Sequence, residues 1–204
     1  MNVHVGIDFD NTIVSYDDLA HSLAVERGLI PESTPASKQA VRDRIRLLPA
    51  GDVEWQRIQV ELYGDKMNEA ALIPGVVPFI RICREGGIPV SIVSHKTERP
   101  NIDPTGPNLQ DAALNWMDAT GFFLSSSLTP GDVYFEPPRD SKVDRIADLG
   151  CTVFIDDLIE VFREPGFPIG VTKILFSPTD GVEEPSLDFT VASSWNAISE
   201  LVLV

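Results

Sequence analysis

Two aspartates, Asp8 and Asp10, stand two positions apart at the end of the first apolar run of the chain, residues 3–9. Carboxylates placed this close together repel one another and raise each other's pKa unless a cation lies between them. In an open parallel sheet, the carboxyl end of such a strand is also where ligands bind. The sequence from Asp8 to Thr12 is equally compatible with a solvated turn, so the pair indicates a site only together with other groups.

A second acidic pair and two further polar side chains complement the first pair. Asp156 and Asp157 follow a later apolar run, and Ser94 ends another. Lys142 lies at the start of a predicted helix, where the helix dipole disfavours a cation unless the side chain points to an anion. Carboxylates suit a hard divalent cation, and a hydroxyl with a lysine suits phosphate oxygens. Arg139 is the alternative to Lys142, since both lie at the start of the same helix.

Short apolar runs rich in β-branched residues alternate with helical patterns, which is typical of a parallel α/β sheet. The predicted strands are residues 3–9, 89–94, 132–135, 152–155 and 172–176, with a weaker sixth at 189–192. The predicted helices between and after them are residues 76–85, 109–119, 141–149 and 195–203. The carboxyl ends of parallel strands meet at one edge of a sheet, so the polar groups at these ends are expected to lie together.

The segment from residue 15 to residue 73 breaks this alternation, because it contains only helical patterns. The predicted helices there are residues 17–28, 35–48, 52–63 and 66–72. We predict a small helical lid inserted after the first strand; the alternative is that these helices simply cover the sheet. The predicted domains are an α/β core of residues 1–14 and 74–204 and a helical cap of residues 15–73.

Composition narrows the classes of function. The formal net charge of −15 argues against nucleic acid as a partner, because a phosphate backbone requires a clustered basic face. No run of eighteen apolar residues predicts a membrane span. The first residues lack the features of a signal peptide. The two cysteines lack metal-ligand spacing and do not indicate a disulfide framework, which fits a reducing cytoplasm. The sequence does not indicate an oligomeric state.

The polar groups resemble the four motifs of the haloacid dehalogenase-like superfamily of phosphatases and phosphotransferases. The matching residues are Asp8 to Thr12 for motif one, Ser94 for motif two, Lys142 for motif three, and Asp156 with Asp157 for motif four. Their order and their predicted strand ends agree with the superfamily, and the helical insert stands where its first type of helical cap is found. Motif four departs from the usual glycine-aspartate form, which leaves open whether Asp156 or Asp157 meets the metal directly.

The resemblance implies a Rossmann-like parallel core with strand order 5-4-1-2-3 and a magnesium-dependent phosphatase that acts on a small phosphorylated metabolite. Asp8 would attack phosphorus to give an aspartyl-phosphate, and Asp10 would act as general acid and then as general base. Asp8, the backbone carbonyl of Asp10, and Asp156 or Asp157 would hold Mg2+.

The resemblance also implies roles for residues near the motifs. The groups expected to hold phosphoryl oxygens follow strand ends or begin a helix: Ser94, Lys142, His95 and the backbone amides of Phe9 and Asn11. Thr12 would support the loop after the first strand. Lys96 and Arg99, in the same loop as His95, are expected as possible substrate contacts.

Several other functions have to be weighed against the phosphatase. A phosphomutase or phosphotransferase of the same superfamily uses the same four motifs and remains an alternative. A dehalogenase needs only the nucleophilic carboxylate, so Asp10 counts against it, and a transport ATPase would have threonine at this position. From a different class, a receiver-like signalling domain would place its acidic pair and phosphate acceptor in another order, and a non-catalytic binding domain is the remaining alternative.

Overall fold

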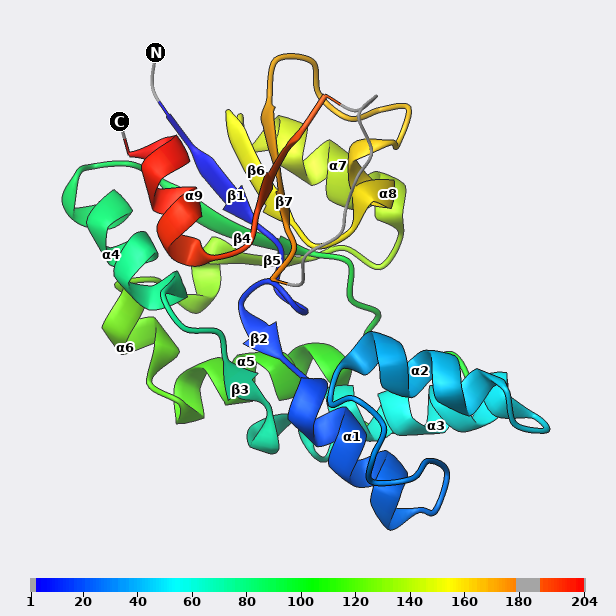
Figure 1. Cartoon of the computed structure of the whole chain (residues 1–204). Coiled ribbons are helices and arrows are strands. Elements are labelled where there is room, and N and C mark those ends of the chain that lie inside the picture. Colours follow the sequence, from blue (N-terminus) through cyan, green and yellow to red (C-terminus); the bar gives the residue numbers. More distant parts are fainter. Residues whose placement is uncertain (1–2, 179–187, 204) are drawn as a thin grey trace. The chain divides into compact units, whose positions relative to one another are not determined.

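The computed structural model describes residues 3–178 and 188–203, which fold as two compact units (Figure 1). The first unit comprises Met1–Ile13, Ile73–Lys96 and Gly121–Val204, and the second comprises Val14–Leu72 and Thr97–Thr120. The second unit therefore contains nearly all of the predicted cap and, in addition, residues 97–120, which the sequence analysis assigned to the core.

Within the described residues, six parallel strands form the sheet of the first unit in the order β5-β4-β1-β6-β7-β8. The strands are β1 (Val5–Ile7), β4 (Val90–Ser94), β5 (Val133–Phe135), β6 (Val153–Asp156), β7 (Thr172–Phe176) and β8 (Thr190–Ala192). The predicted order 5-4-1-2-3 is confirmed, with β7, β6, β1, β4 and β5 as those five strands. The weaker sixth strand is also present, as β8 beside β7.

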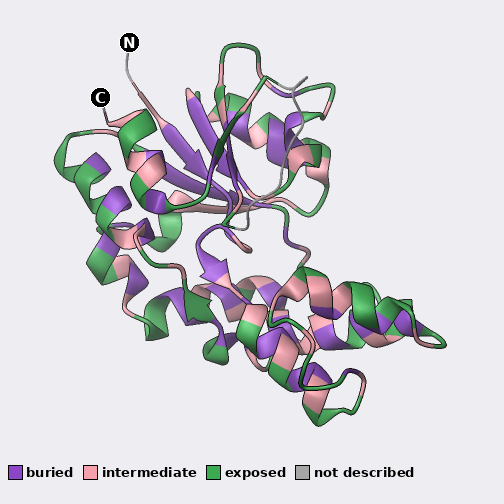
Figure 2. Ribbon diagram, viewed as in Figure 1, coloured by how far each residue is buried: buried purple, intermediate pink, exposed green. Residues whose placement is uncertain are grey.

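Helices cover both faces of this sheet, which explains why every residue of its central strands is buried (Figures 1 and 2). These helices are α4 (Val76–Glu85) and α9 (Trp195–Val202) on one face, and α7 (Arg139–Asp148) and α8 (Ile159–Phe162) on the other. On the first face Trp195 stacks near Phe79 and Phe176, at ring-centroid distances of 5.1 and 5.9 Å. On the second face Phe154 and Phe162 pack around Phe167.

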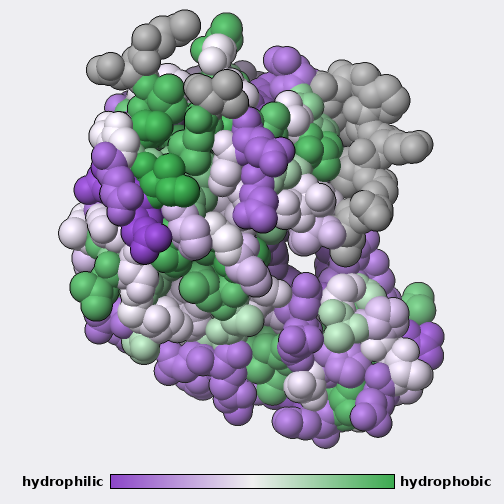
Figure 3. Space-filling view, turned by 60° about the vertical axis from the view of Figure 1, so that its left-hand side comes forward, coloured by the Kyte–Doolittle hydropathy of each residue, from purple (hydrophilic) through white to green (hydrophobic). Residues whose placement is uncertain are grey.

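Two short helical elements of the first unit have no counterpart in the sequence analysis: α6 (Phe122–Ser126) and the 3-10 helix η2 (Pro130–Asp132). Both are too short to show a helical period. Figure 3 brings the side of α4 and α9 forward, and hydrophobic residues there form separate green areas among white and purple ones. In the part of the chain that is described, no helix has both the length and the apolarity needed to cross a membrane.

The second unit consists mainly of helices. They are α1 (Asp17–Glu26), α2 (Lys38–Arg46), α3 (Gly51–Tyr63), the 3-10 helix η1 (Met67–Glu69) and α5 (Leu109–Ala119). The predicted helix at residues 66–72 is wrong beyond its first turn. Ala70 adopts an extended conformation, and β3 (Ala71–Leu72) then pairs antiparallel with β2 (Val14–Ser15). The hydrogen bonds of this ladder replace those that would have continued the helix.

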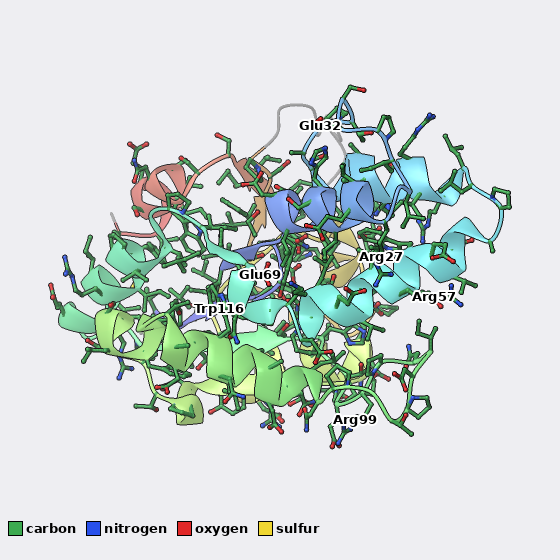
Figure 4. The ribbon with its side chains drawn as sticks, turned by 90° about the horizontal axis from the view of Figure 1, so that it is seen from below. Arg27, Glu32, Arg57, Glu69, Arg99 and Trp116 are labelled. Atoms are coloured by element: carbon green, nitrogen blue, oxygen red, sulfur yellow. The ribbon has the colours of Figure 1, made fainter. Side chains whose placement is uncertain are left out.

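Residues 97–120 belong to the second unit because α5 packs against η1 and α3. The indole of Trp116, in the C-terminal half of α5 and labelled in Figure 4, is fully buried and donates a 3.0 Å hydrogen bond to the carbonyl of Ala70. Asn108 begins the helix by accepting hydrogen bonds from two backbone amides of its first turn. The sequence of α5 is compatible with either unit. The hydrogen bond from the buried Trp116 to Ala70 explains why α5 belongs to the second unit.

Candidate active site

The carboxyl ends of β1 and β6 place two acidic side chains at one edge of the sheet. Ile7 pairs with Ile155 in parallel register, and Asp8 donates its backbone amide to the carbonyl of Ile155 at 2.9 Å. Asp8 and Asp156 are thus the residues that directly follow a pair of residues facing each other on neighbouring strands. Both side chains are buried, as the sequence pattern predicts for carboxylates that end buried strands.

Lys142 joins these two carboxylates. Its Nζ lies 2.6 Å from an oxygen of Asp8 and 2.6 Å from an oxygen of Asp156, and its side chain is 1% exposed. Arg139, the alternative cation of the sequence analysis, instead lies 3.5 Å from Glu164. Of the two candidates, Lys142 is therefore the one that contacts the acidic groups.

The electrostatics of this triad are set by burial and by the lysine. Burial raises the pKa of Asp8 from its usual 3.8 to about 7, against the opposing effect of Lys142 and with further increases from Asp156 and Asp10. Burial by itself would lower the pKa of Lys142, but the charges of Asp156 and Asp8 outweigh it and raise this pKa above its usual value. The site therefore holds a charged ammonium beside a carboxyl group that is costly to ionise without a further cation.

Asp8, Asp156 and Asp157 each offer a carboxylate oxygen, and these oxygens lie within 4.8 Å of one another. Asn11 donates a 3.0 Å hydrogen bond to Asp157, and Asp156 accepts one from the amide of Leu158 at 2.9 Å. Three carboxylates against one lysine leave an excess of negative charge, and hard oxygen ligands are those that Mg2+ prefers. The donor set thus fits a hard divalent cation.

Asp10 has a different partner from the other acids. Lys96 Nζ lies 2.8 Å from one oxygen of its carboxylate and 3.1 Å from the other, and the side chain of Lys96 is only 3% exposed. Lys96 is predicted from the sequence as a possible substrate contact, and its ion pair with Asp10 is not predicted. Lys96 stands two positions after Ser94, beyond the end of the strand next to β1, and this spacing predicts the edge of the sheet on which Lys96 lies but not its partner.

Ser94 and Thr12 carry buried hydroxyl groups that have no hydrogen-bond partner among the described residues. Ser94 ends β4, and its backbone carbonyl accepts the amide of Glu136 at 2.9 Å, which fixes the strand end beside β5. An unpaired buried hydroxyl is unfavourable, and at Ser94 it provides a donor for an anionic ligand. The carbonyl of Thr12 accepts a 3.1 Å hydrogen bond from the indole of Trp195, which links the loop after β1 to α9.

The loop that carries Phe9 and Asn11 is a tight turn. Ile13 donates its amide to the carbonyl of Phe9 at 2.9 Å, and Asn11 has a φ of 59°. This left-handed conformation is one that asparagine tolerates better than most residues. The turn brings Asn11 back toward Asp157.

The two remaining predicted residues lie in different units. His95, in the first unit, bonds through Nδ1 to the carbonyl of Glu136 at 3.1 Å, and partial burial lowers its pKa. Nδ1 must carry the hydrogen to donate to a carbonyl, so Nε2 of the neutral ring is an acceptor. Arg99 belongs to the second unit (Figure 4), where its guanidinium donates to the carbonyl of Gly106.

Comparisons with known proteins identify the fold to which this sheet and its site belong. No family model and no curated protein matches the chain. Among solved structures, a HAD family hydrolase from Deinococcus radiodurans, with bound phosphate and sodium, has a TM-score of 0.59 at 17% identity over 98% of this chain and 95% of that chain. A phosphoserine phosphohydrolase-like protein from Francisella tularensis has a TM-score of 0.59 at 13% identity over 98% of this chain and 99% of that chain.

An L-2-haloacid dehalogenase is similar to the same degree, with a TM-score of 0.57 at 13% identity over 100% of both chains. Relatives with one fold and such different descriptions establish architecture and not activity. The strand order, the helices on both faces of the sheet and these likenesses agree. The chain has the α/β fold of the haloacid dehalogenase-like (HAD) hydrolases.

Proposed function

We propose that the protein is a magnesium-dependent phosphatase that hydrolyses a small phosphorylated metabolite through an aspartyl-phosphate on Asp8. The observation that carries this proposal is the pair of acids at the end of β1 with separate cationic partners. Asp8 is held by Lys142, whereas Asp10 is held by Lys96. One acid is thereby available as nucleophile and the other for proton transfer.

In the first step, a carboxylate oxygen of Asp8 attacks phosphorus while the bond from phosphorus to the ester oxygen breaks. The electron pair of that bond goes to the leaving oxygen, and Asp10 supplies its proton. In the second step, Asp10 takes a proton from water, whose oxygen attacks the phosphorus of the aspartyl-phosphate while the bond from phosphorus to the Asp8 oxygen breaks and its electron pair returns to that oxygen. This releases inorganic phosphate and restores both carboxyl groups.

The phosphoryl oxygens need partners while charge shifts between them. The buried hydroxyl of Ser94 and the ammonium of Lys142 are suited to this role, together with the backbone amides of Phe9 and Asn11 and with His95. Asp8, the backbone carbonyl of Asp10, and Asp156 or Asp157 would hold magnesium, which when bound offsets the repulsion between carboxylate and phosphate.

The likeness to a haloacid dehalogenase supports a second candidate, in which Asp8 displaces halide from carbon. A leaving halide needs no proton, so this reaction gives no role to Asp10 or to its pairing with Lys96. The phosphatase uses both residues, which is why we prefer it. A phosphomutase would use the same residues and differs only in where the phosphoryl group goes next.

A phosphate-release screen over sugar phosphates, nucleoside monophosphates and phosphorylated acids, with and without Mg2+, tests the proposal. We expect metal-dependent release by the wild type and none by Asp8→Asn. Turnover without metal, or turnover by the Asp8→Asn variant, would contradict the mechanism. Transfer of phosphate between positions of a sugar with none released would favour the mutase, and halide release without phosphatase activity would favour the dehalogenase.

The size of the substrate is proposed from the helical unit. A lid that closes over a site excludes water and admits compact ligands, and the resemblance assigns that function to the insert. Adding phosphopeptides to the screen as large substrates tests this part of the proposal, and a preference for them over small esters would contradict it.

A further inference from the structure

The ion pair between Lys96 and Asp10 is largely buried and does not lie on the protein surface. The Lys96 side chain is 3% exposed and that of Asp10 is 19% exposed. The ammonium also lies 5.7 Å from the centroid of the Phe9 ring, within the range of a cation–π contact. A lysine is rarely buried unless it is paired, so its position depends on the carboxylate that it contacts.

The geometry of the pair restricts the carboxylate in turn. One ammonium reaches both oxygens of Asp10, at 2.8 and 3.1 Å. Rotation of the carboxylate about its Cβ–Cγ bond would break at least one of these contacts. The strand end that precedes Lys96 is also fixed, because the carbonyl of Ser94 accepts a hydrogen bond from the amide of Glu136.

We propose that Lys96 is a positioning residue that holds the carboxyl group of Asp10 in the orientation needed for proton transfer; this inference rests on the proposed phosphatase function. In the first step the bond to the leaving oxygen breaks, and the proton of Asp10 moves to that oxygen. Asp10 is left as a carboxylate, and the ammonium of Lys96 lies beside the negative charge that it gains. Lys96 itself neither gives nor takes a proton.

A positioning role for Lys96 depends on the leaving group. An ester whose leaving oxygen is already a stable anion needs no proton, whereas an ester of a poor leaving group depends on one. Loss of Lys96 should therefore slow the second kind of ester much more than the first. A lysine that merely supported the fold would affect both kinds equally.

The test measures kcat/KM, which reports the steps up to formation of the aspartyl-phosphate, with Mg2+ and three probes: dinitrophenyl, nitrophenyl and phenyl phosphate. For Lys96→Met we expect kcat/KM to fall less than about threefold with dinitrophenyl phosphate. With phenyl phosphate we expect kcat/KM to fall about tenfold to a hundredfold, which is a part of the rate enhancement that general acid catalysis contributes. Asp10→Asn should show the same trend, and the double variant should lose no more than Asp10→Asn alone.

Matched variants separate positioning from folding. Lys173→Met removes another lysine of the first unit that lies over an aromatic ring, 5.0 Å from the Phe167 centroid, and should leave all three rates unchanged. Lys96→Gln keeps one donor for one oxygen of Asp10 and should lie between the wild type and Lys96→Met. Thermal unfolding identifies any variant that fails to fold, in which case Lys96→Gln carries the comparison.

The outcomes distinguish this inference from the proposed function. An equal loss with all three esters, or no loss with phenyl phosphate, would overturn the role of Lys96 while leaving the phosphatase intact. Absence of phosphate release by the wild type from every ester, including the metabolite panel, would overturn the phosphatase and this inference with it. A loss that grows from dinitrophenyl to phenyl phosphate would support both.

Discussion

The chemistry of the candidate site depends on a few side chains whose partners differ. At the end of β1, Lys142 contacts Asp8 and Lys96 contacts Asp10. The sequence predicted Asp8, Asp156 and Lys142 together, because each stands at a strand end or a helix start where its charge is otherwise unfavourable. It could not predict the partner of Lys96, because only the register of β1 against β4 brings that loop to Asp10.

Ser94 should be important for activity and unimportant for stability. Its hydroxyl is buried without a partner, whereas Ser91, on the same strand, bonds to the ring of His4 at 3.0 Å. Ser94→Ala should therefore leave the free energy of unfolding unchanged or slightly raised, while Ser91→Ala lowers it by about 1 kcal/mol. Removing a donor to the phosphoryl group should lower kcat about a hundredfold for Ser94→Ala.

Urea unfolding and phosphate release measured on both variants check this prediction. A clear loss of stability in Ser94→Ala with full activity would show that the hydroxyl serves the fold.

The raised pKa of Asp8 gives the metal-free protein a specific dependence on pH. Since burial raises this pKa from 3.8 to about 7 in the folded state, the folded protein holds the proton more tightly than the unfolded chain. The contribution of Asp8 to stability therefore falls as pH rises from 3.8 to about 7 and is constant above that range. Asp8→Asn cannot ionise and lacks this loss.

Thermal unfolding in the presence of a chelator measures the effect. The melting temperature of Asp8→Asn minus that of the wild type should increase across this window, while Lys142 stays charged throughout because its pKa lies above the usual value. A difference that is constant with pH, or that shrinks as pH rises, would contradict the burial argument.

At the scale of elements, the buried parallel strands were predicted well because their apolar runs are short, continuous and bounded by turn residues. The predicted helix at residues 66–72 failed because β3 is formed by pairing with β2, which is distant in sequence. The placement of α5 was missed for a similar reason. Its assignment depends on the contact of Trp116 with Ala70, and no local pattern of α5 contains that information.

The start of α4 depends on a glycine at residue 75. Gly75 has a φ of 93°, and a Cβ built there would lie 2.8 Å from the Cβ of Trp195. Gly75→Ala should lower the free energy of unfolding by about 1–2 kcal/mol for the left-handed backbone and about 1–3 kcal/mol more for overpacking. Gly87→Ala, at a φ of 73° with no atom within 4 Å, should show only the backbone effect.

Denaturant unfolding of both glycine variants checks the packing of α9 against this turn. Equal losses in the two variants would show that Trp195 moves aside without cost.

At the scale of the whole molecule, the chain passes between its two compact units four times, at residues 13–14, 72–73, 96–97 and 120–121. The four motifs all lie in the first unit, although 59 residues of the second unit, Val14–Leu72, separate the first motif from the second. The expectation that the insert is a domain of its own follows from its helical pattern. The inclusion of residues 97–120 does not, because it depends on tertiary packing.

Binding of magnesium should stabilise the folded chain as a whole. A ligand at a hundred times its dissociation constant contributes about 2.7 kcal/mol, which for a chain of this size raises the melting temperature by roughly 5–10 °C. Asp157→Asn removes one carboxylate of the acidic group and should reduce this shift, whereas Asp118→Asn, an exposed residue of α5, should not. An equal shift in Asp157→Asn would leave Asp156 as the acid that meets the cation, and an equal shift in Asp156→Asn as well would place the cation elsewhere.

The proposed mechanism depends above all on a covalent bond between phosphorus and Asp8. Rapid mixing of the wild type with a substrate from the screen and Mg2+, acid quenching and mass spectrometry of the peptides tests this directly. We predict a phosphoryl group on the peptide that contains Asp8 during turnover, and none on the same peptide of Asp8→Asn. Phosphate release with no adduct on this peptide, or with an adduct on another residue, would contradict the account.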